Sequence, residues 1–82
     1  MVLRDIYNVV GEAAQETFFS EMSSICEVIN VNTQADYRYS GHNDDICLGC
    51  DRSEVFDKEW VLGLPVVGIS ALNDHVLIWV DG

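Results

Sequence analysis

Positive charge is scarce in this sequence. Its 82 residues hold four Lys and Arg against fourteen Asp and Glu, which gives a formal net charge of −10. Proteins recognise DNA, RNA and anionic lipid through clustered Lys and Arg, so direct binding to any of these is disfavoured. An anionic surface instead attracts a basic protein surface. We therefore expect a basic protein as partner, with no direct contact to nucleic acid or membrane.

Disulfide pairing and membrane insertion also lack support. Three cysteines, an odd number, do not form the framework of a small secreted protein. No basic N-terminal segment precedes an apolar stretch, as it does in a signal peptide. The apolar runs are shorter than the roughly 20 residues that a membrane-spanning helix needs. These features predict a soluble protein of the cytoplasm with reduced thiols.

Apolar residues are plentiful despite the charge. They make up 49% of the sequence, and aromatic residues make up 10%, which is enough to build a core and argues against intrinsic disorder. A chain of this length forms one domain. We find no repeat or linker, and expect a single acidic domain over residues 1–82.

The first third of the chain has a helical pattern. Over residues 4–29, apolar side chains recur at steps of three and four, which places them on one stripe of a helix. Gly11 weakens such a helix by about 1 kcal/mol relative to Ala, so a kink or break there is the alternative. The stripe consists of Tyr7, Val10, Ala14, Phe18, Met22, Ile25 and Ile29.

The rest of the chain predicts short strands. Residues 34–40, 64–72 and 75–80 alternate or are rich in Val and Ile, as strands are. Residues 41–51 are typical of a loop, and residues 53–60 of a short helix. Together these elements predict an α+β fold, in which the long N-terminal helix packs on an antiparallel sheet of about three strands. The last strand is apolar on both faces, which predicts a central position and raises self-association into a homodimer as a further expectation.

Catalytic motifs are missing, so we expect no enzyme. No serine lies in a nucleophile elbow. The pairs Asp44/Asp45 and Asp51/Glu54 lack the ligand pattern of a calcium loop. A Cys–His nucleophilic pair, drawn from Cys47 or Cys50 with His42 or His75, has no signature in its favour.

The cysteines suggest an alternative function. Cys47 and Cys50 are separated by two residues, a spacing that suits one tetrahedral zinc ion, and Cys26 and His42 would complete the ligand set. Strong zinc motifs have two such pairs, whereas this chain has one. Cysteines that pack in the core are the simpler interpretation and outweigh zinc. The alternative is thus a zinc-stabilised interaction module.

The carboxylates fall into two groups. One lies on the polar side of the expected N-terminal helix, and the other lies in the middle of the chain. An ordinary solvated surface explains any single member, but uncompensated carboxylates repel one another, and the whole distribution suits the mimicry of a nucleic-acid backbone. The first group is Asp5, Glu12, Glu16 and Glu27, and the second is Asp44, Asp45, Asp51, Glu54, Asp57 and Glu59.

Aromatic residues beside acids are typical of protein contacts. Phe19 falls next to the acidic side of the expected helix, so we assign it and the tyrosines to a partner contact. Small size, strong acidity and the lack of a catalytic motif are shared by phage counter-defence inhibitors and toxin-immunity proteins. We expect such an inhibitor, which would block a basic, nucleic-acid-handling protein through its carboxylates.

Overall fold

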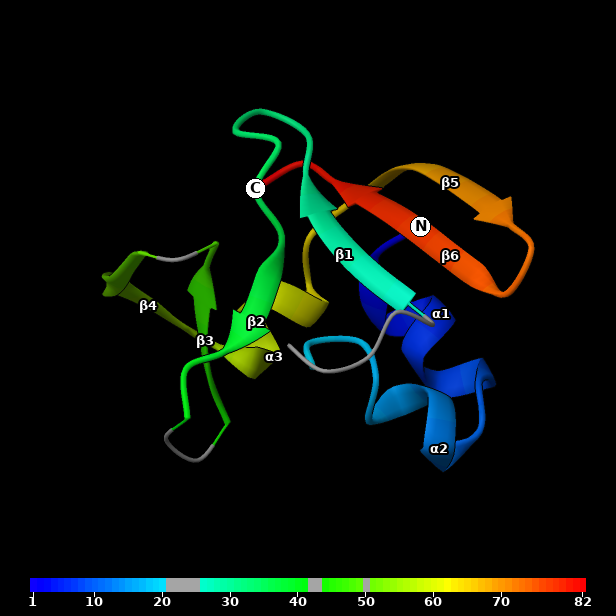
Figure 1. The fold of residues 1–82 in the computed structure, drawn as a ribbon, viewed down its shortest axis with the longest axis horizontal. Helices are drawn as coiled ribbons and strands as arrows, with labels where there is room; N and C mark the ends of the chain where they lie inside the picture. Colours follow the sequence, from blue (N-terminus) through cyan, green and yellow to red (C-terminus); the bar gives the residue numbers. More distant parts are fainter. Residues whose placement is uncertain (21–25, 42–43, 50) are drawn as a thin grey trace.

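The computed structural model describes residues 1–20, 26–41, 44–49 and 51–82, and most of its regular structure is β-strand (Figure 1). Six strands and three short helices lie within these ranges. In chain order they are α1 (Leu3–Val9), α2 (Glu12–Gln15), β1 (Cys26–Asn30), β2 (Tyr37–Tyr39), β3 (Asp45–Leu48), β4 (Asp51–Asp57), α3 (Lys58–Leu62), β5 (Val66–Leu72) and β6 (His75–Val80).

The strands form two sheets of three. In the first sheet the order is β1-β6-β5, with β1 parallel to β6 and β5 antiparallel to it. In the second sheet the order is β2-β3-β4, and both pairs are antiparallel. A two-residue turn joins β5 to β6, and its first residue, Asn73, has a φ of 53°, which Asn tolerates better than most residues.

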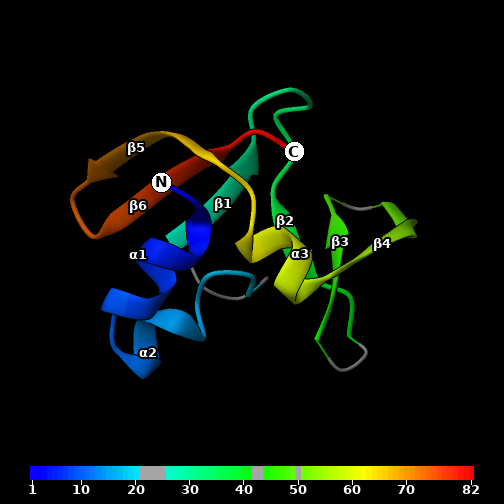
Figure 2. The ribbon, with the colours of Figure 1, turned by 180° about the vertical axis from the view of Figure 1, so that it is seen from behind.

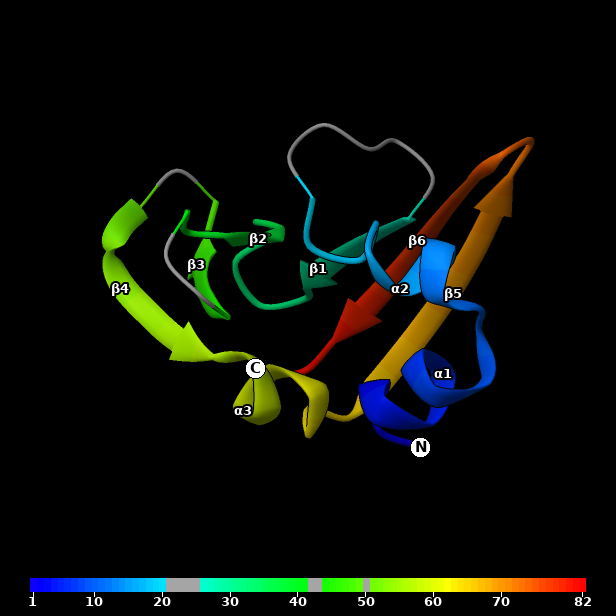
Figure 3. The same cartoon turned by 90° about the horizontal axis from the view of Figure 1, so that it is seen from below.

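A bridge between Ile29 and Asp36 connects the two sheets. Next to it, the backbone N–H of Asn30 donates to the carbonyl of Ala35 at 2.9 Å. Seen from below, the six strands follow one another as a curved row from β4 to β5 (Figure 3). Helices α1 and α3 lie on the same side of the molecule (Figure 2), and α3 leads from β4 at one end of the row to β5 at the other.

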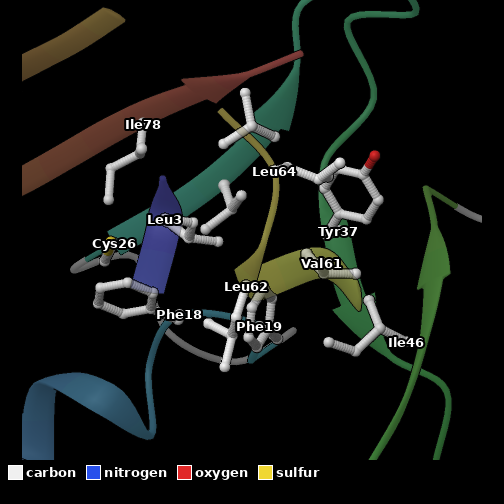
Figure 4. Close-up of a cluster of buried hydrophobic side chains, with 12 residues drawn as sticks. Leu3, Phe18, Phe19, Cys26, Tyr37, Ile46, Val61, Leu62, Leu64 and Ile78 are labelled. Atoms are coloured by element: carbon white, nitrogen blue, oxygen red, sulfur yellow. The ribbon is translucent and has the colours of Figure 1, made fainter. Parts of the chain in front are cut away.

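The core lies between the strands and the helices (Figure 4). It draws on both sheets, because each contributes the face that its alternating side chains present to the helices. Phe19 makes edge-to-face contacts with both Phe18 and Tyr39, at ring separations of 6.2 and 5.7 Å. The buried members are Leu3, Phe18, Phe19, Cys26, Val28, Tyr37, Ile46, Val61, Leu62, Leu64, Ile78 and Val80.

The long N-terminal helix is not formed, so the prediction of an α+β fold organised around it is wrong. Helix α1 ends at Val9, and Val10 and Gly11 are extended, with ψ near 160° (156° and 163°). This is the break at Gly11 that the sequence allows, but α2 beyond it has only four residues. At the far end of the expected helix, β1 is a strand, and residues 21–25 between them lie outside the described residues.

Sheet pairing explains why β1 is not helical. Its burial alternates, with Cys26, Val28 and Asn30 buried and the residues between them half-buried. The same apolar residues fit a step of two as well as a step of three or four, so the pattern alone is ambiguous. Parallel pairing with β6 from Cys26 to Asn30 decides the matter, because it supplies ladder hydrogen bonds and a buried face together.

The middle of the chain also differs from expectation. Strand β3 lies in the segment 41–51 that composition predicts to be a loop, and β4 takes up most of the expected helix 53–60. Asp57 caps α3, and its carboxylate accepts the backbone N–H of Glu59 at 3.3 Å. The hydroxyl of Ser53 donates to Asp51 within β4.

The C-terminal hairpin matches the sequence best. Strand β6 has the expected bounds and is the central strand of its sheet, while β5 and β2 lie inside the segments predicted for them. The first sheet is mixed, however, where an antiparallel sheet was expected. In the described ranges no helix has the length and apolar character needed to cross a bilayer.

Candidate protein-binding surface

The carboxylates from the middle of the chain gather around strand β4, the last strand of the second sheet. Asp45 lies directly opposite Asp57 in the pairing of β3 with β4. Asp51 begins the strand and Asp57 ends it, and the pairing with β3 is irregular between Val55 and Asp51. We name this surface the β4 edge and define it as Asp44, Asp45, Asp51, Glu54, Val55, Asp57, Glu59 and Trp60.

The opposition of Asp45 and Asp57 is unfavourable for folding. Residues directly opposite in an antiparallel pair point to the same face, and like charges there are destabilising. Both side chains are exposed, so water screens the repulsion. Asp57 offsets part of it by capping α3, where the positive end of the helix dipole favours a carboxylate. Asp45 makes no comparable contact with a described residue.

The β4 edge carries an excess of negative charge. Over residues 44–60 six acids stand against two bases, Arg52 and Lys58. Outside this stretch, Arg4 pairs with Glu59, with 2.6 Å between Nη1 and Oε2. Lys58 forms no ion pair with a described carboxylate.

Lys58 lies next to the acids in sequence but not in the structure. It follows Asp57, yet its ammonium lies over the rings of Tyr7 and Tyr39, 5.2 and 5.8 Å from their centroids. Its pKa lies above the ordinary value, chiefly because a hydrogen bond with Tyr7 favours the charged form. Burial acts in the opposite direction and is the smaller effect. Lys58, which lies between Asp57 and Glu59 in sequence, thus holds α1 against β2 instead of pairing with these acids.

Hydrogen bonds from Ser53 favour the charged form of Asp51. Its Oδ1 accepts the hydroxyl of Ser53 at 2.5 Å and the backbone N–H of Ser53 at 3.0 Å. These two bonds lower the pKa of Asp51 below its ordinary value, because both favour the carboxylate. Asp51 therefore stays charged at pH values where an ordinary aspartate begins to take up a proton.

Two apolar side chains at this edge were missed in the sequence. Trp60 is 48% exposed and stacks on Phe56, with 4.9 Å between the rings, and Val55 is 49% exposed. The sequence places Trp60 next to Glu59, which is a signal for a partner contact, but the prediction assigned that contact to Phe19. Exposed tryptophan next to charge is typical of residues that dominate binding energy in protein interfaces.

Phe19 itself is 1% exposed, so its assignment to a partner contact is wrong. It packs between Phe18 and Tyr39, because the chain turns after α2 and brings two successive aromatic rings into the core. Tyr37 is also buried, and its hydroxyl accepts a hydrogen bond from the side-chain N–H of Asn30 at 2.9 Å. Tyr39 is half-buried beneath Lys58.

The other carboxylate group is dispersed. Glu12 and Glu16 are exposed at α2, and Asp5 accepts the backbone N–H of Val2 at the start of α1. Glu27 lies on β1, with Oε2 3.3 Å from Nε2 of His75 but without hydrogen-bond alignment. Because the expected helix is not formed, these acids do not share one helical face. Figures 1 and 3 place α2 and β4 in different parts of the molecule.

The described cysteines are not brought together. Cys26 is buried in β1 of the first sheet, and Cys47 is buried in β3 of the second. Figure 4 shows Cys26 and Ile46 on opposite sides of the core, and Cys47, next to Ile46, points to the other face of its sheet. Among the described residues no group of three His, Cys, Asp or Glu could hold a metal ion. The other proposed ligands, His42 and Cys50, lie outside the described residues.

Burial also makes Cys26 a poor ligand. It raises the pKa of the thiol to about 11, with a further contribution from the neighbouring Glu27. Zinc binds the thiolate, so this environment opposes the form that the metal needs.

Comparisons with protein-family models, with curated proteins and with solved structures find no match to this chain.

Proposed function

We propose that this protein is a small inhibitor that binds a basic, nucleic-acid-handling protein through the β4 edge. In this proposal its carboxylates occupy the groove meant for DNA or RNA, as in a phage counter-defence or toxin-immunity protein. The observation that carries the proposal is the excess of carboxylates in and around β4, six against Arg52 and Lys58 over residues 44–60, together with the position of the Lys58 ammonium over Tyr7 and Tyr39.

The energetics of the edge support a role outside folding. The repulsion between Asp45 and Asp57 lowers the stability of the free protein, and Asp45 makes no side-chain contact with a described residue that would offset it. A basic partner would remove the repulsion on binding and would be steered to the edge by charge. The same carboxylates that destabilise the free domain would therefore stabilise the complex.

Trp60 and Val55 support a protein as the ligand. Charge alone gives a weak, salt-sensitive encounter, whereas an exposed aromatic ring can fill a pocket of the partner and slow dissociation. Trp60 is held in place by its stack on Phe56, with an interplanar angle of 13°, so little conformational freedom is lost on binding.

The first experiment is capture of the partner by tagged protein from lysate of the source cells, with and without competing DNA. We expect a basic protein that is released by excess DNA and by moderate salt, because screening weakens charge-steered contacts. A partner indifferent to both would contradict the nucleic-acid mimicry.

Two double variants with the same change of charge locate the contact. Asp45→Asn with Glu54→Gln removes two charges from the β4 edge, and Glu12→Gln with Glu16→Gln removes two from α2. We expect the first to raise the Kd for the partner by roughly tenfold or more, and the second by a few-fold at most. The reverse order would place the contact on α2. Unfolding cannot explain the expected loss, because removing the charge of Asp45 relieves repulsion.

A further inference from the structure

Strand β5 is the outer strand of the first sheet and has a free side. Pairing with β6 uses one side of the strand. On the other side, the chain start covers only the beginning: the N–H of Val66 donates to the carbonyl of Met1 at 2.9 Å, and Val2 bridges Pro65. From Val67 onward no described residue pairs with this side. Its alternate N–H and C=O groups are therefore open to a further strand.

The exposed side chains of β5 are apolar and uncharged. Val67, Ile69 and Leu72 are 55%, 53% and 62% exposed. Residues 60–73 contain no Asp, Glu, Lys or Arg. Natural edge strands are usually protected by charged side chains, by proline or by a bulge. The pairing of β5 with β6 is irregular between Val66 and Gly68, but no charged side chain or proline occurs between Val66 and Leu72. The regular part of the edge, from Gly68 to Leu72, is therefore suited to pairing with another strand.

We propose that a second copy of this chain pairs with this edge, β5 against β5 in antiparallel orientation. A two-fold axis near Ile69 relates the copies, so that each strand presents the same uncharged surface to the other. The first sheet of one copy and the first sheet of the other then form one continuous sheet of six strands. This dimer is independent of the proposed inhibitor function, because it uses the sheet edge farthest along the strand row from β4 (Figure 3).

The charge distribution favours a second copy over a basic partner at this edge. A basic protein is drawn to β4, where the carboxylates are, and finds no counter-charge along β5. Two copies that each carry a net charge of −10 repel one another. Salt limits this repulsion mainly to charges within about 8 Å of one another, so it is smallest where charge is locally absent. The stretch 60–73 is such a place. Pairing there also keeps the β4 edge of each copy at the far end of its strand row, away from the interface (Figure 3), which limits repulsion between the two β4 edges.

Sedimentation equilibrium tests the dimer with a matched pair of variants. Ile69→Lys puts two lysines close together at the proposed axis, and Val55→Lys adds the same charge to the other edge strand at a site of similar exposure, 49% against 53%. We expect the wild type and Val55→Lys to sediment at twice the chain mass of 9.2 kDa. We expect Ile69→Lys to raise the dimer Kd by roughly tenfold or more.

Salt gives the dimer a signature opposite to that of the inhibitor complex. Raising the ionic strength screens repulsion between the two anionic copies and should tighten the dimer, whereas it should weaken binding to a basic partner. A wild-type protein that remains a monomer at high concentration and high salt would overturn the proposal. A dimer that Ile69→Lys leaves intact would overturn it as well.

Hydrogen exchange of the wild type keeps the test independent of any variant that fails to fold. Amides of Val67 to Leu72 that face the free side should exchange more slowly as protein concentration rises, while amides of β4 should not change. Equal protection of the β5 amides at a concentration where sedimentation shows a monomer and at one where it shows a dimer would place the interface elsewhere.

Discussion

The two outer strands of the molecule, β4 and β5, are both seven residues long, and both end a three-stranded sheet. Strand β4 carries three acids, Asp51, Glu54 and Asp57, and one base, Arg52, whereas β5 carries no charge. Charge on an edge strand prevents pairing with another copy, and its absence permits pairing. The contrast indicates that the two edges serve different ligands: a basic protein at β4, and a second copy at β5.

The largest effects on stability should come from the core that both sheets share, because this core determines whether the two sheets unfold together. Ile46 of the second sheet and Ile78 of the first are 0% and 1% exposed. Replacing either by Ala should lower the free energy of unfolding by about 2–5 kcal/mol, because it leaves a cavity. Urea unfolding followed by tryptophan fluorescence and by circular dichroism should show one coincident transition for each variant. Separate transitions would mean that the sheets fold independently.

The next effect concerns Lys58, which holds the two halves together through Tyr7 and Tyr39. Lys58→Met keeps the length of the side chain but removes the ammonium from both rings, and should cost about 1–2 kcal/mol. Arg4→Met removes the same charge from the exposed pair with Glu59 and should cost less than about 1 kcal/mol. Equal losses in thermal unfolding would show that the ring contacts add nothing.

A smaller effect, of opposite sign, should arise at the acidic edge. Asp45→Asn removes the repulsion from Asp57 and should stabilise the domain by roughly 0.2–1 kcal/mol. Asp44→Asn changes the same charge one residue earlier, outside the strand pair, and serves as the control. The gain should shrink in high salt, since the repulsion is exposed to screening. A gain that is identical in both variants would reflect net charge alone.

At neutral pH the least visible difference lies in the buried thiol of the first sheet. The pKa of Cys26 is raised from 9.0 to about 11, first by burial and second by Glu27. The folded state therefore holds the proton more tightly than the unfolded state. Its contribution to stability is present below pH 9 and is lost as the pH rises to about 11. Chemical denaturation across this range should show the loss in the wild type and a smaller one in Cys26→Ala.

Local signals were enough for the C-terminal hairpin. The bounds of β6, its central position and the turn at Asn73 follow from alternation and turn chemistry within a few residues of each other. The N-terminal segment shows the limit of such signals. Between residues 4 and 29 the apolar spacing fits a helix, but the extended backbone at Gly11 and the pairing of Cys26 with Val76 are set by residues far along the chain.

The candidate site was predicted in part. The mid-chain acids are adjacent in sequence, so they gather around β4 in any fold that keeps this segment on the surface. The position of Lys58 was not predictable, because it lies among these acids in sequence while its ammonium lies over the rings of Tyr7 and Tyr39. The exchange of Phe19 for Trp60 as the exposed aromatic has the same origin, since burial depends on which elements pack together.

The sequence by itself therefore determined the excess of negative charge, the acidic middle segment and the C-terminal hairpin, because each depends on composition or on neighbours along the chain. Tertiary structure alone decided that β1 is a strand beside β6, that Lys58 is turned inward, and that β4 and β5 become the two free edges. These features depend on pairings between distant residues. Their free energy comes from backbone ladders and shared burial, which no local pattern contains.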